Sequence, residues 1–422
     1  MRLHQEGLLA SILDVAFKDS SFYHEFYGAE GIGRSDIQGL EDLKCLPILT
    51  KELFINNSHK MLARGFPRNE TSLCRTSGST GQRLIFRRDN SVGSFHLAHQ
   101  LRGRSWWNLY PGDTEIKFWG TAWRFEESLK GKVTAYLRWL KDRSMGVLHL
   151  SAFAVKETDL EIAYKKLIKV RPRLLFGYGT AIYMFADFIK RNYGNIANNR
   201  PEVIIYTSEY LSAVRREMIG EVFNCPVVSE YGSVECGIHS YQCRSGQNHF
   251  SDETLFYEVI DSQGHPITDG RGTLLLTHLR ENAAPIIRYQ IGDIVNIKNG
   301  GKYECECGVK LSVLNEIRGR ENDLIRSPSG DYVHPEVFDY IMRYQTEIER
   351  FRIIEETVGK LRILLQVKKP MREVNIDLLV KKLEEHAGKD FEYVIEQTDS
   401  IPNEPGGKFR WVISKLHEKG DL

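Results

Sequence analysis

The central part of the chain, from about residue 91 to 232, alternates between short apolar runs and longer segments with helical spacing. The apolar runs predict strands at Glu115–Trp119, Val147–Leu150, Leu174–Tyr178, Val203–Thr207 and Val227–Ser229. The segments around them predict helices over 91–103, 127–140, 158–170, 180–192 and 212–223. Apolar runs that alternate with amphipathic helices are typical of an α/β layer with a largely parallel sheet.

The pattern differs on either side of this region. The apolar stripe near the N-terminus predicts a helix over 5–27, and two β-like runs follow at Thr71–Cys74 and Arg83–Phe86. From about 250 to 315, short β-like runs are separated by Gly, Asn and Asp. They are Phe256–Ile260, Gly272–Thr277, Ile286–Tyr289 and Ile294–Ile297. This pattern indicates a β-rich subdomain attached to the α/β part.

A further change comes near residue 320. The following residues predict a helix near 335–345, strands at 350–356 and 361–368, a helix at 373–387 and a strand at 391–397. About 100 residues is within the usual size of one domain. The predicted fold class is therefore α/β, with a large N-terminal α/β domain that carries the β-rich subdomain (residues 1–319). A small C-terminal α+β domain follows (residues 320–422).

Composition narrows the class of protein. A chain of 422 residues with 41% hydrophobic residues can bury a sizeable core, and two domains are expected at this length. The net charge of +1 argues against a general nucleic-acid or membrane-surface binder. Seven scattered cysteines do not suggest a disulfide scaffold, so a cytoplasmic setting is expected. The N-terminus lacks the apolar run of a signal peptide, and no stretch approaches the roughly 18 apolar residues of a membrane span.

A loop of small residues joins the two β-like runs that precede the α/β layer. It reads Thr76, Ser77, Gly78, Ser79, Thr80 and Gly81. Glycine permits a close backbone approach, successive N–H groups can form an anion nest, and the hydroxyls add donors. The loop predicts a strand–loop–strand phosphate clamp, and a flexible surface turn is the alternative.

Two acidic residues are candidate ligand-binding residues because of the stretches in which they lie. Glu235 closes Tyr231-Gly232-Ser233-Val234-Glu235 directly after a predicted strand, where ligands bind in open α/β sheets. Glu235 could hold Mg²⁺ against phosphates, and Tyr231 could stack on a flat ring. Asp293 follows Gly292 at what reads as an exposed β-turn, where its carboxylate could accept hydrogen bonds from a ribose diol. Ordinary polar turns are the alternative in both places.

Two basic residues extend this set. Arg320 lies at the predicted domain junction, in Arg318-Gly319-Arg320, and arginine suits phosphate or ribose recognition. Lys408 lies on a turn rich in Pro and Gly near the C-terminus, and a lysine there can reach a developing negative charge. A solvated linker arginine and an exposed turn lysine are the alternatives.

Four cysteine and histidine residues indicate a metal site. Cys243 and His249 are followed, some 60 residues later, by the pair Cys305 and Cys307. Three thiols and an imidazole form a common closed set for structural zinc. Cys236 and His239 are rival ligands, and unpaired reduced thiols are the alternative.

Aromatic residues gather at the predicted strand ends. Trp119, Trp123, Tyr178 and Tyr206 could line a pocket for a flat or apolar acid. Core packing is the alternative for each of them.

Together, in this order, these stretches resemble the adenylate-forming superfamily of acyl-CoA synthetases and adenylation domains, and most of all its phenylacetate–CoA ligase and CapK-like branch. The resemblance implies that the 76–81 loop binds phosphate, that Glu235 is the magnesium position, and that Asp293 binds ribose. Its hinge motif corresponds to 317–320 and places Arg320 at the nucleotide. Lys408 resembles the family's mobile catalytic lysine, which implies a mobile C-terminal domain. Some members of this branch carry zinc on similarly spaced Cys and His residues.

The resemblance implies an enzyme that joins a small carboxylic acid to ATP, releases pyrophosphate, and transfers the acyl group to an acceptor. CoA is the first candidate acceptor, and an amine or hydroxyl is the second. A nucleotide-binding assembly protein without turnover is the alternative outside the enzymes. The expected cofactors are ATP or AMP, Mg²⁺ and a structural Zn²⁺, with CoA as a further candidate. No nucleic-acid partner is expected, and a homodimer is one candidate assembly. The sequence does not identify the acid, because 118–123 is unlike the corresponding region of phenylacetate ligases.

Overall fold

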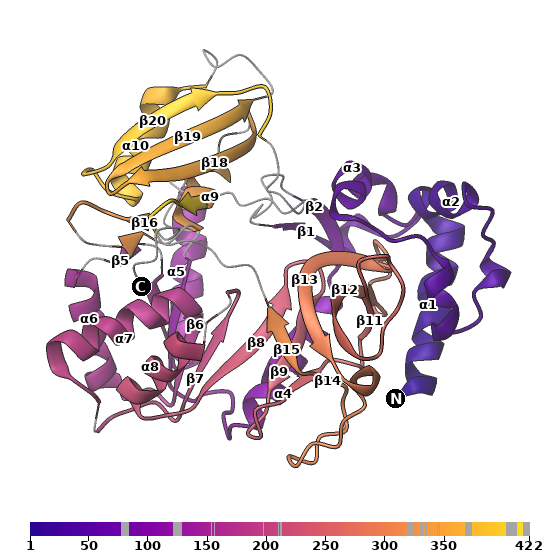
Figure 1. The fold of residues 1–422 in the computed structure, drawn as a ribbon, viewed down its shortest axis with the longest axis horizontal. Helices are drawn as coiled ribbons and strands as arrows, with labels where there is room; N and C mark the ends of the chain where they lie inside the picture. Colours follow the sequence, from indigo (N-terminus) through magenta and orange to yellow (C-terminus); the bar gives the residue numbers. More distant parts are fainter. Residues whose placement is uncertain are drawn as a thin grey trace. The chain divides into compact units, whose positions relative to one another are not determined.

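The computed structural model describes the chain except for a few segments. The described residues are 1–76, 84–120, 129–152, 154–155, 157–196, 198–209, 211, 213–318, 325–329, 332–333, 336–343, 345, 347–367, 374–401 and 412–416. They form two compact units (Figure 1). Unit 1 comprises 1–76, 84–108 and 229–318, and unit 2 comprises 109–228 and the described residues beyond 324.

Unit 1 begins with helices. They are α1 (Arg2–Asp19), α2 (Ser21–Gly28), η1 (Arg34–Asp36), η2 (Leu40–Cys45), α3 (Lys51–Met61) and η3 (Arg68–Glu70). The single helix predicted over 5–27 is wrong, because the backbone at Ser20 is extended (φ −96°, ψ 116°). The buried Ser20 side chain instead accepts a hydrogen bond from the Tyr23 N–H and caps α2. A break at a capping serine lets α1 and α2 each turn an apolar side inward.

The two strands predicted on either side of the phosphate loop are confirmed, although the second begins at Ile85 and not at Arg83, and the loop itself lies outside the described residues. Strands β1 (Thr71–Arg75) and β2 (Ile85–Asp89) pair antiparallel, with Arg75 opposite Ile85. Thr76 extends the ladder by one step, because its N–H donates to the Leu84 carbonyl at 3.0 Å. Helix α4 (Val92–Ser105) follows.

Two antiparallel arrangements of strands complete unit 1. Strands β8 (Val227–Ser233), β9 (Gly237–Gln242), β10 (Asn248–Phe250) and β14 (Val313–Leu314) pair in that order, and the first two residues of β8 belong to unit 2. The second sheet has the order β11 (Leu255–Ile260), β12 (Gly270–His278), β13 (Tyr289–Ile297) and β15 (Glu316–Arg318). The short helix η5 (Asn299–Gly301) follows β13.

Strand β13 corrects two predictions. The strands predicted at Ile286–Tyr289 and Ile294–Ile297 are one strand that begins at Tyr289. Gly292 and Asp293 do not form an exposed β-turn, because they lie in an irregularity where the pairing shifts between Thr273 and Leu275 of the neighbouring strand. Gly292 has φ +91°, which favours glycine, and Asp293 is half-buried in the strand.

The core of unit 1 joins its helices to both sheets. Leu9 and Tyr23 of the helices are fully buried in one apolar cluster with Phe250 of β10 in the first sheet and with Leu274 and Tyr289 in the second. Segments from both ends of the sequence of unit 1 therefore depend on each other for burial.

Unit 2 contains the predicted parallel strands. Strands β7 (Val203–Thr207), β6 (Leu174–Tyr178), β3 (Glu115–Trp119) and β4 (Val147–Ser151) are parallel neighbours in that order. The helices are α5 (Leu129–Ser144), α6 (Glu157–Val170), α7 (Gly179–Tyr193) and α8 (Ala213–Phe223). Phe118 of β3 contacts Phe185 of α7, which in turn contacts Phe223 of α8. These helices therefore cover the face of the sheet that Phe118 occupies.

The C-terminal part of unit 2 has a sheet of its own. Its order is β20 (Glu392–Gln397), β19 (Lys360–Val367), β18 (Ile348–Thr357) and β21 (Val412–Ser414), with helices α9 (Glu336–Arg343) and α10 (Ile376–His386). A small sheet joins β16 (Ile325–Arg326) and β17 (Tyr332–Val333) to β5 (Ala154–Val155).

The fold class predicted from the sequence is confirmed as mixed α/β, and the C-terminal residues have an α+β arrangement with a sheet of their own. The division into domains 1–319 and 320–422 stays a prediction. Among the described residues, no helix combines the length and the apolar character that crossing a bilayer requires.

Candidate functional site

Thr76 lies at the mouth of the predicted phosphate loop. Its side chain is 5% exposed, and its hydroxyl oxygen accepts a hydrogen bond from the Leu84 N–H at 3.2 Å. The hydroxyl proton can still be donated. Thr76 therefore fixes where the two strands open. Ser77, Gly78, Ser79, Thr80 and Gly81 lie outside the described residues.

The hairpin between β8 and β9 carries Glu235. Ser233 pairs with Gly237, so Val234, Glu235 and Cys236 form the connection. The Ser233 hydroxyl accepts from the Cys236 N–H at 3.1 Å and lies 3.1 Å from His239 Nε2. Burial lowers the pKa of His239 to about 3, so its neutral imidazole can accept the Ser233 proton.

Gly232 is required by this hairpin. A Cβ at Gly232 would lie 2.5 Å from the carbonyl oxygen of Gly237 on the neighbouring strand. Any side chain would therefore push the two strands apart. The glycine in this stretch therefore has a structural reason, and we also count it among the predicted nucleotide-binding residues.

The structure connects the Glu235 hairpin to β13 by two hydrogen bonds from tyrosines to carboxylates. The Tyr289 hydroxyl donates to Glu235 Oε1 at 3.0 Å, and the Tyr231 hydroxyl donates to Asp293 Oδ2 at 2.7 Å. We call Tyr231, Glu235, Tyr289 and Asp293 the carboxylate site. Two predicted site residues from separate motifs are thus brought together in unit 1.

Two residues of the carboxylate site, Glu235 and Tyr289, are buried, and Tyr231 and Asp293 are half-buried. Glu235 is 6% exposed, and Tyr289 is fully buried with its ring edge-on to Phe54 at 5.4 Å. The Tyr231 ring packs edge-on against His239 at 4.8 Å. Hydrogen bonds to a carboxylate are stronger in such surroundings than in water. The arrangement holds both acidic side chains in fixed positions.

Sequence reasoning missed the role of Tyr289. The sequence pattern places Tyr289 only at the end of a predicted strand, Ile286–Tyr289, and gives it no role in the site. Its position four residues before Asp293 on an apparent strand was the available signal, but the partner Glu235 lies 54 residues away. A contact of that range has no local sequence pattern.

The aromatic residues predicted to line an acid pocket divide between the two faces of the parallel sheet. Trp119 stacks on Tyr178 with ring centroids 4.7 Å apart, and the Lys117 ammonium lies 4.8 Å from the Trp119 ring. Tyr206 pairs in register with Gly177, the neighbour of Tyr178, so it lies on the opposite face. The structure therefore brings Trp119 and Tyr178 together but not Tyr206.

Three other predicted site residues lie outside the described residues. They are Trp123, Arg320 and Lys408. Their predicted roles in acid binding, nucleotide binding and catalysis remain predictions.

The four predicted metal ligands do come together in unit 1. The donor atoms of Cys243, His249, Cys305 and Cys307 all lie within 4.8 Å of one another, and we call them the thiol–imidazole cluster. Cys243 Sγ lies 3.7 Å from Cys305 Sγ, and His249 Nε2 lies 3.1 Å from Cys307 Sγ. Three thiols and one imidazole match the donor set of a closed tetrahedral zinc site. The rival ligands Cys236 and His239 are not in this cluster.

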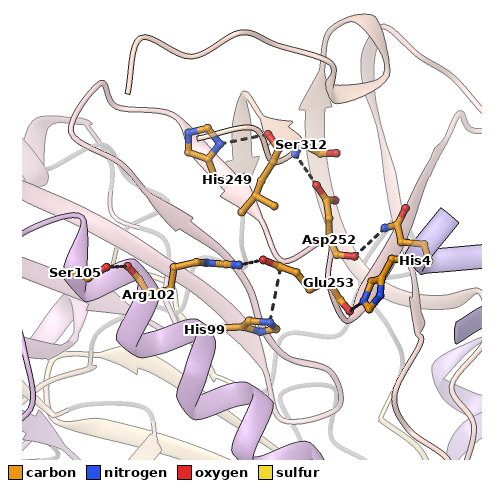
Figure 2. A network of polar contacts seen from close by, with 10 residues as sticks. His4, His99, Arg102, Ser105, His249, Asp252, Glu253 and Ser312 are labelled. Carbon is orange, nitrogen blue, oxygen red and sulfur yellow. Dashed lines mark hydrogen bonds and ion pairs between the residues drawn. The ribbon is translucent and has the colours of Figure 1, made fainter. Parts of the chain in front are cut away.

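Hydrogen bonds behind the thiol–imidazole cluster orient His249 (Figure 2). His249 Nδ1 lies 3.3 Å from the Leu311 carbonyl, which favours a proton on Nδ1 and leaves Nε2 for a metal. The next residue, Ser312, donates its N–H to Asp252 at 2.6 Å. Burial raises the pKa of Asp252 to about 6.

The same network extends to two helices. Gln5 of α1 donates to the Asp252 carbonyl at 2.9 Å, while Arg102 and His99 of α4 face Glu253 (Figure 2). The thiol–imidazole cluster is therefore tied to the packing of unit 1.

Comparisons with known proteins place the chain among relatives. Residues 325–415 match the family model described as CapK C-terminal domain. The chain is 24% identical over 402 residues to Protein CapK of Staphylococcus aureus, covering 94% of this chain and 86% of that protein. It is 21% identical over 449 residues to Phenylacetate-coenzyme A ligase of Thermus thermophilus, covering 98% and 96%.

A solved structure shares the fold. The crystal structure of 2-Hydroxyisobutyryl-CoA Ligase in complex with 2-HIB-AMP and CoA has a TM-score of 0.64 and 16% identity, with 99% of this chain and 90% of that chain covered. The resemblance found in the sequence motifs is thus confirmed by whole-chain similarity and by fold. Over nearly its whole length the chain is therefore similar to CapK and to phenylacetate-coenzyme A ligase, and it shares the fold of 2-Hydroxyisobutyryl-CoA Ligase.

Proposed function

We propose that the chain activates a small carboxylic acid with ATP, releases pyrophosphate, and transfers the acyl group to CoA. The observation that carries this proposal is the carboxylate site, in which Glu235 and Asp293 come from two motifs and are held by Tyr289 and Tyr231. The full-length similarity to Phenylacetate-coenzyme A ligase supports the same reaction.

The main chemical obstacle to this reaction is the repulsion between two negatively charged reactants. A carboxylate is a weak nucleophile, and it must approach the α-phosphate of a polyanion. Catalysis therefore depends on alignment and on positive charge or hydrogen-bond donors placed where negative charge develops. The loop that follows Thr76 in the sequence would hold the β- and γ-phosphates, and Asp293 would accept hydrogen bonds from the ribose hydroxyls.

Glu235 is proposed to hold Mg²⁺. The Tyr289 hydroxyl occupies one lone-pair direction of Oε1, and a carboxylate has further lone pairs for an ion. Bound Mg²⁺ would neutralise phosphate charge. Tyr289 orients the carboxylate and reduces the freedom that ion binding would otherwise have to remove.

Arg320 and Lys408 are proposed to complete the site. Arg320 would contact the nucleotide, and Lys408 would contact the attacking and bridging oxygens during adenylation. Since Lys408 belongs to the proposed mobile domain, 320–422, it would act in the first half-reaction and withdraw for the second. The pivot of this motion is proposed to lie at Asn322 or Asp323, the residues that follow the hinge motif 317–320 in the sequence.

The acid is proposed to lie against Trp119 and Tyr178. Their stacked rings at the ends of β3 and β6 offer a flat apolar surface, and Lys117 adds positive charge beside it. A flat or apolar acid fits this surface. Trp119→Ala should raise the apparent KM for such an acid, whereas Tyr206→Phe, on the other face, should not.

The thiol–imidazole cluster is proposed to hold one structural Zn²⁺ per chain. Its four donors form a closed set, which leaves no open position for a substrate. Zinc would stabilise unit 1 and would take no part in acid activation.

An amine or a hydroxyl is the second candidate acceptor after CoA, as the resemblance to the CapK-like branch implies. The match of 325–415 to the CapK C-terminal domain keeps this class open, because the C-terminal region is the part proposed to rearrange for acyl transfer.

The test is release of pyrophosphate from ATP with a panel of acids, with and without CoA. We expect acid-dependent release, and formation of a thioester when CoA is present. Glu235→Gln and Asp293→Asn should each abolish most of the release, while Glu30→Gln, an exposed carboxylate in unit 1, should not. Release followed by acyl transfer only to amines or hydroxyls would select the second acceptor class. ATP binding without release for any acid would favour a nucleotide-binding assembly protein.

A further inference from the structure

Helix α5 of unit 2 (Figure 1) turns only a narrow side toward its neighbours. Among its residues from 132 to 144, Ala135 and Asp142 alone are half-buried, and the others are exposed. Asp142 Oδ2 lies 3.0 Å from Nε2 of His149 on β4. Residues seven apart share one side of a helix, so Ala135 and Asp142 mark the side that faces the sheet.

The opposite side of α5 carries an apolar stripe. Val133, Tyr136, Leu137 and Leu140 follow the spacing i, i+3, i+4, i+7, and their exposed fractions are 59%, 59%, 60% and 43%. We call these four residues the α5 face. A surface helix ordinarily buries its apolar stripe, so this helix has the reverse orientation. A contiguous exposed apolar stripe of this kind marks an interaction surface.

Basic and aromatic side chains border the α5 face. Leu129–Ser144 contains five basic residues and one acidic residue, Asp142, although the whole chain has a net charge of only +1. Lys132, Lys141 and Arg143 are exposed beside the stripe. Trp139 stacks on Tyr136 at 5.8 Å, and the Arg143 guanidinium lies 6.0 Å from the Trp139 ring. Although positive and negative charges nearly balance over the whole chain, the surface of α5 is therefore locally basic and aromatic.

We propose that the α5 face docks on an anionic lipid bilayer, with the helix lying in the plane of the interface. A helix of this kind inserts its apolar side chains at the acyl boundary, while lysine and arginine contact anionic headgroups. Tyr136 and Trp139 have the amphipathic rings that favour this depth. The charge of the helix complements an anionic membrane.

A second copy of the chain fits the α5 face less well. A symmetric contact through this face would bring two basic helices together, and the like charges would oppose it. The proposed acid activation neither requires nor predicts a membrane contact, so the inference goes beyond it.

The test is co-sedimentation of the full chain with vesicles. We expect binding to vesicles that contain phosphatidylglycerol, weak binding to vesicles of phosphatidylcholine alone, and loss of binding as salt increases. The double variant Leu137→Glu with Leu140→Glu should lower the bound fraction by roughly tenfold or more, because burial of even one leucine is worth about a decade in an equilibrium constant. Ile162→Glu on α6, another exposed apolar residue of unit 2, is the matched control and should bind as the wild type does.

Two further measurements keep the result interpretable. Trp139 fluorescence, taken as the difference between wild type and Trp139→Phe, should shift to shorter wavelength with phosphatidylglycerol vesicles. Pyrophosphate release should be unchanged in the double variant without vesicles, which shows that the protein is folded and separates this inference from the proposed function. Failure to bind anionic vesicles would overturn the proposal. Self-association that the double variant abolishes would also overturn it, in favour of a second copy as the occupant.

Discussion

The carboxylate site and the thiol–imidazole cluster are built in the same way but are held together differently. Both lie in unit 1, and both join residues 62 positions apart, Tyr231 with Asp293 and Cys243 with Cys305. In the carboxylate site, each acidic group has a hydroxyl donor from a tyrosine, so its geometry does not require an ion. In the cluster, three thiols and an imidazole converge within 4.8 Å, and a cation would satisfy all four together.

Because the two sites are held together differently, they should support different properties of the protein, activity in one case and stability in the other. A site that is already hydrogen-bonded can exchange substrates without unfolding its surroundings, because the protein itself fixes the side chains. A closed donor set gains its stability from the ion, and binding energy at such a site is folding energy. We therefore expect substitutions in the carboxylate site to lower activity and substitutions in the cluster to lower stability.

The largest effect is expected from loss of a cluster ligand. Cys305→Ser should reduce the free energy of unfolding by about 4 kcal/mol or more, since loss of a structural metal is among the few changes with effects of that size. Denaturant unfolding with metal analysis of the purified protein measures this. Cys45→Ser, an exposed thiol in unit 1, is the control. Unchanged stability in Cys305→Ser, or no zinc in the wild type, would remove the proposed structural role.

The next effect concerns Lys408. Lys408→Ala should slow acyl-adenylate formation by roughly 10²-fold or more, the scale of a lost electrostatic donor. It should affect ATP binding and acyl transfer from preformed acyl-adenylate much less, because the charge is needed mainly in the first transition state. Separate assays of the two half-reactions measure this, with Lys415→Ala as the control. Adenylation at the wild-type rate would leave Lys408 as an ordinary turn lysine.

The free energy of unfolding is expected to depend on pH through Asp252, which belongs to the hydrogen-bond network behind the thiol–imidazole cluster. Burial raises the pKa of Asp252 from 3.8 to about 6, so the folded state holds this proton more tightly than the unfolded state. Its contribution to stability is therefore present at low pH and is lost as pH rises from about 4 to about 6, by up to about 3 kcal/mol. Asp252→Asn should not show this loss, so it should gain stability relative to wild type over that interval.

Unfolding measured across this pH range decides the Asp252 prediction. Asp269 offers a contrast of opposite sign, because backbone hydrogen bonding from Asn299 lowers its pKa. Its contribution should be lost as pH falls. A constant difference between wild type and Asp252→Asn would show that Asp252 titrates normally.

The smallest effect is expected from one hydroxyl in the carboxylate site. Tyr289→Phe keeps the ring packed against Phe54 and removes the donor to Glu235. We expect acid-dependent pyrophosphate release to fall roughly tenfold or more, because a hydrogen bond to a charged group contributes about 1.5–3 kcal/mol. Tyr303→Phe, an exposed tyrosine in unit 1, should behave as the wild type. An equal loss of activity in both variants would remove the positioning role of Tyr289.

Much of the fold could be predicted because its signals are local. The runs Leu174–Tyr178 and Val203–Thr207 are continuous and apolar, as buried parallel strands require, and the structure has them with the same bounds. The break at Ser20 was missed because the apolar stripe continues through it. The irregularity in β13 was missed because Gly292-Asp293 reads as a turn, although its glycine has the positive φ that such a sequence predicts.

The carboxylate site and the thiol–imidazole cluster also differ in how far the sequence predicts them. The four ligands of the cluster could be predicted from residue type and spacing, since cysteine and histidine pairs are rare enough to be informative. The bonds from Tyr231 to Asp293 and from Tyr289 to Glu235 could not, because they depend on how a hairpin and a distant strand meet. The same is true of the α5 face, since its pattern predicts an amphipathic helix but not which side faces solvent.

The most direct measurement compares acid-dependent pyrophosphate exchange into ATP, per folded molecule, in Glu235→Gln and Cys305→Ser. The carboxylate site is proposed to perform the chemistry and the thiol–imidazole cluster to hold the fold. Glu235→Gln should therefore remain folded and lose most of the exchange, while Cys305→Ser should exchange at the wild-type rate for each molecule that stays folded. Exchange at the wild-type rate in folded Glu235→Gln, with any acid that supports exchange in the wild type, would contradict this account.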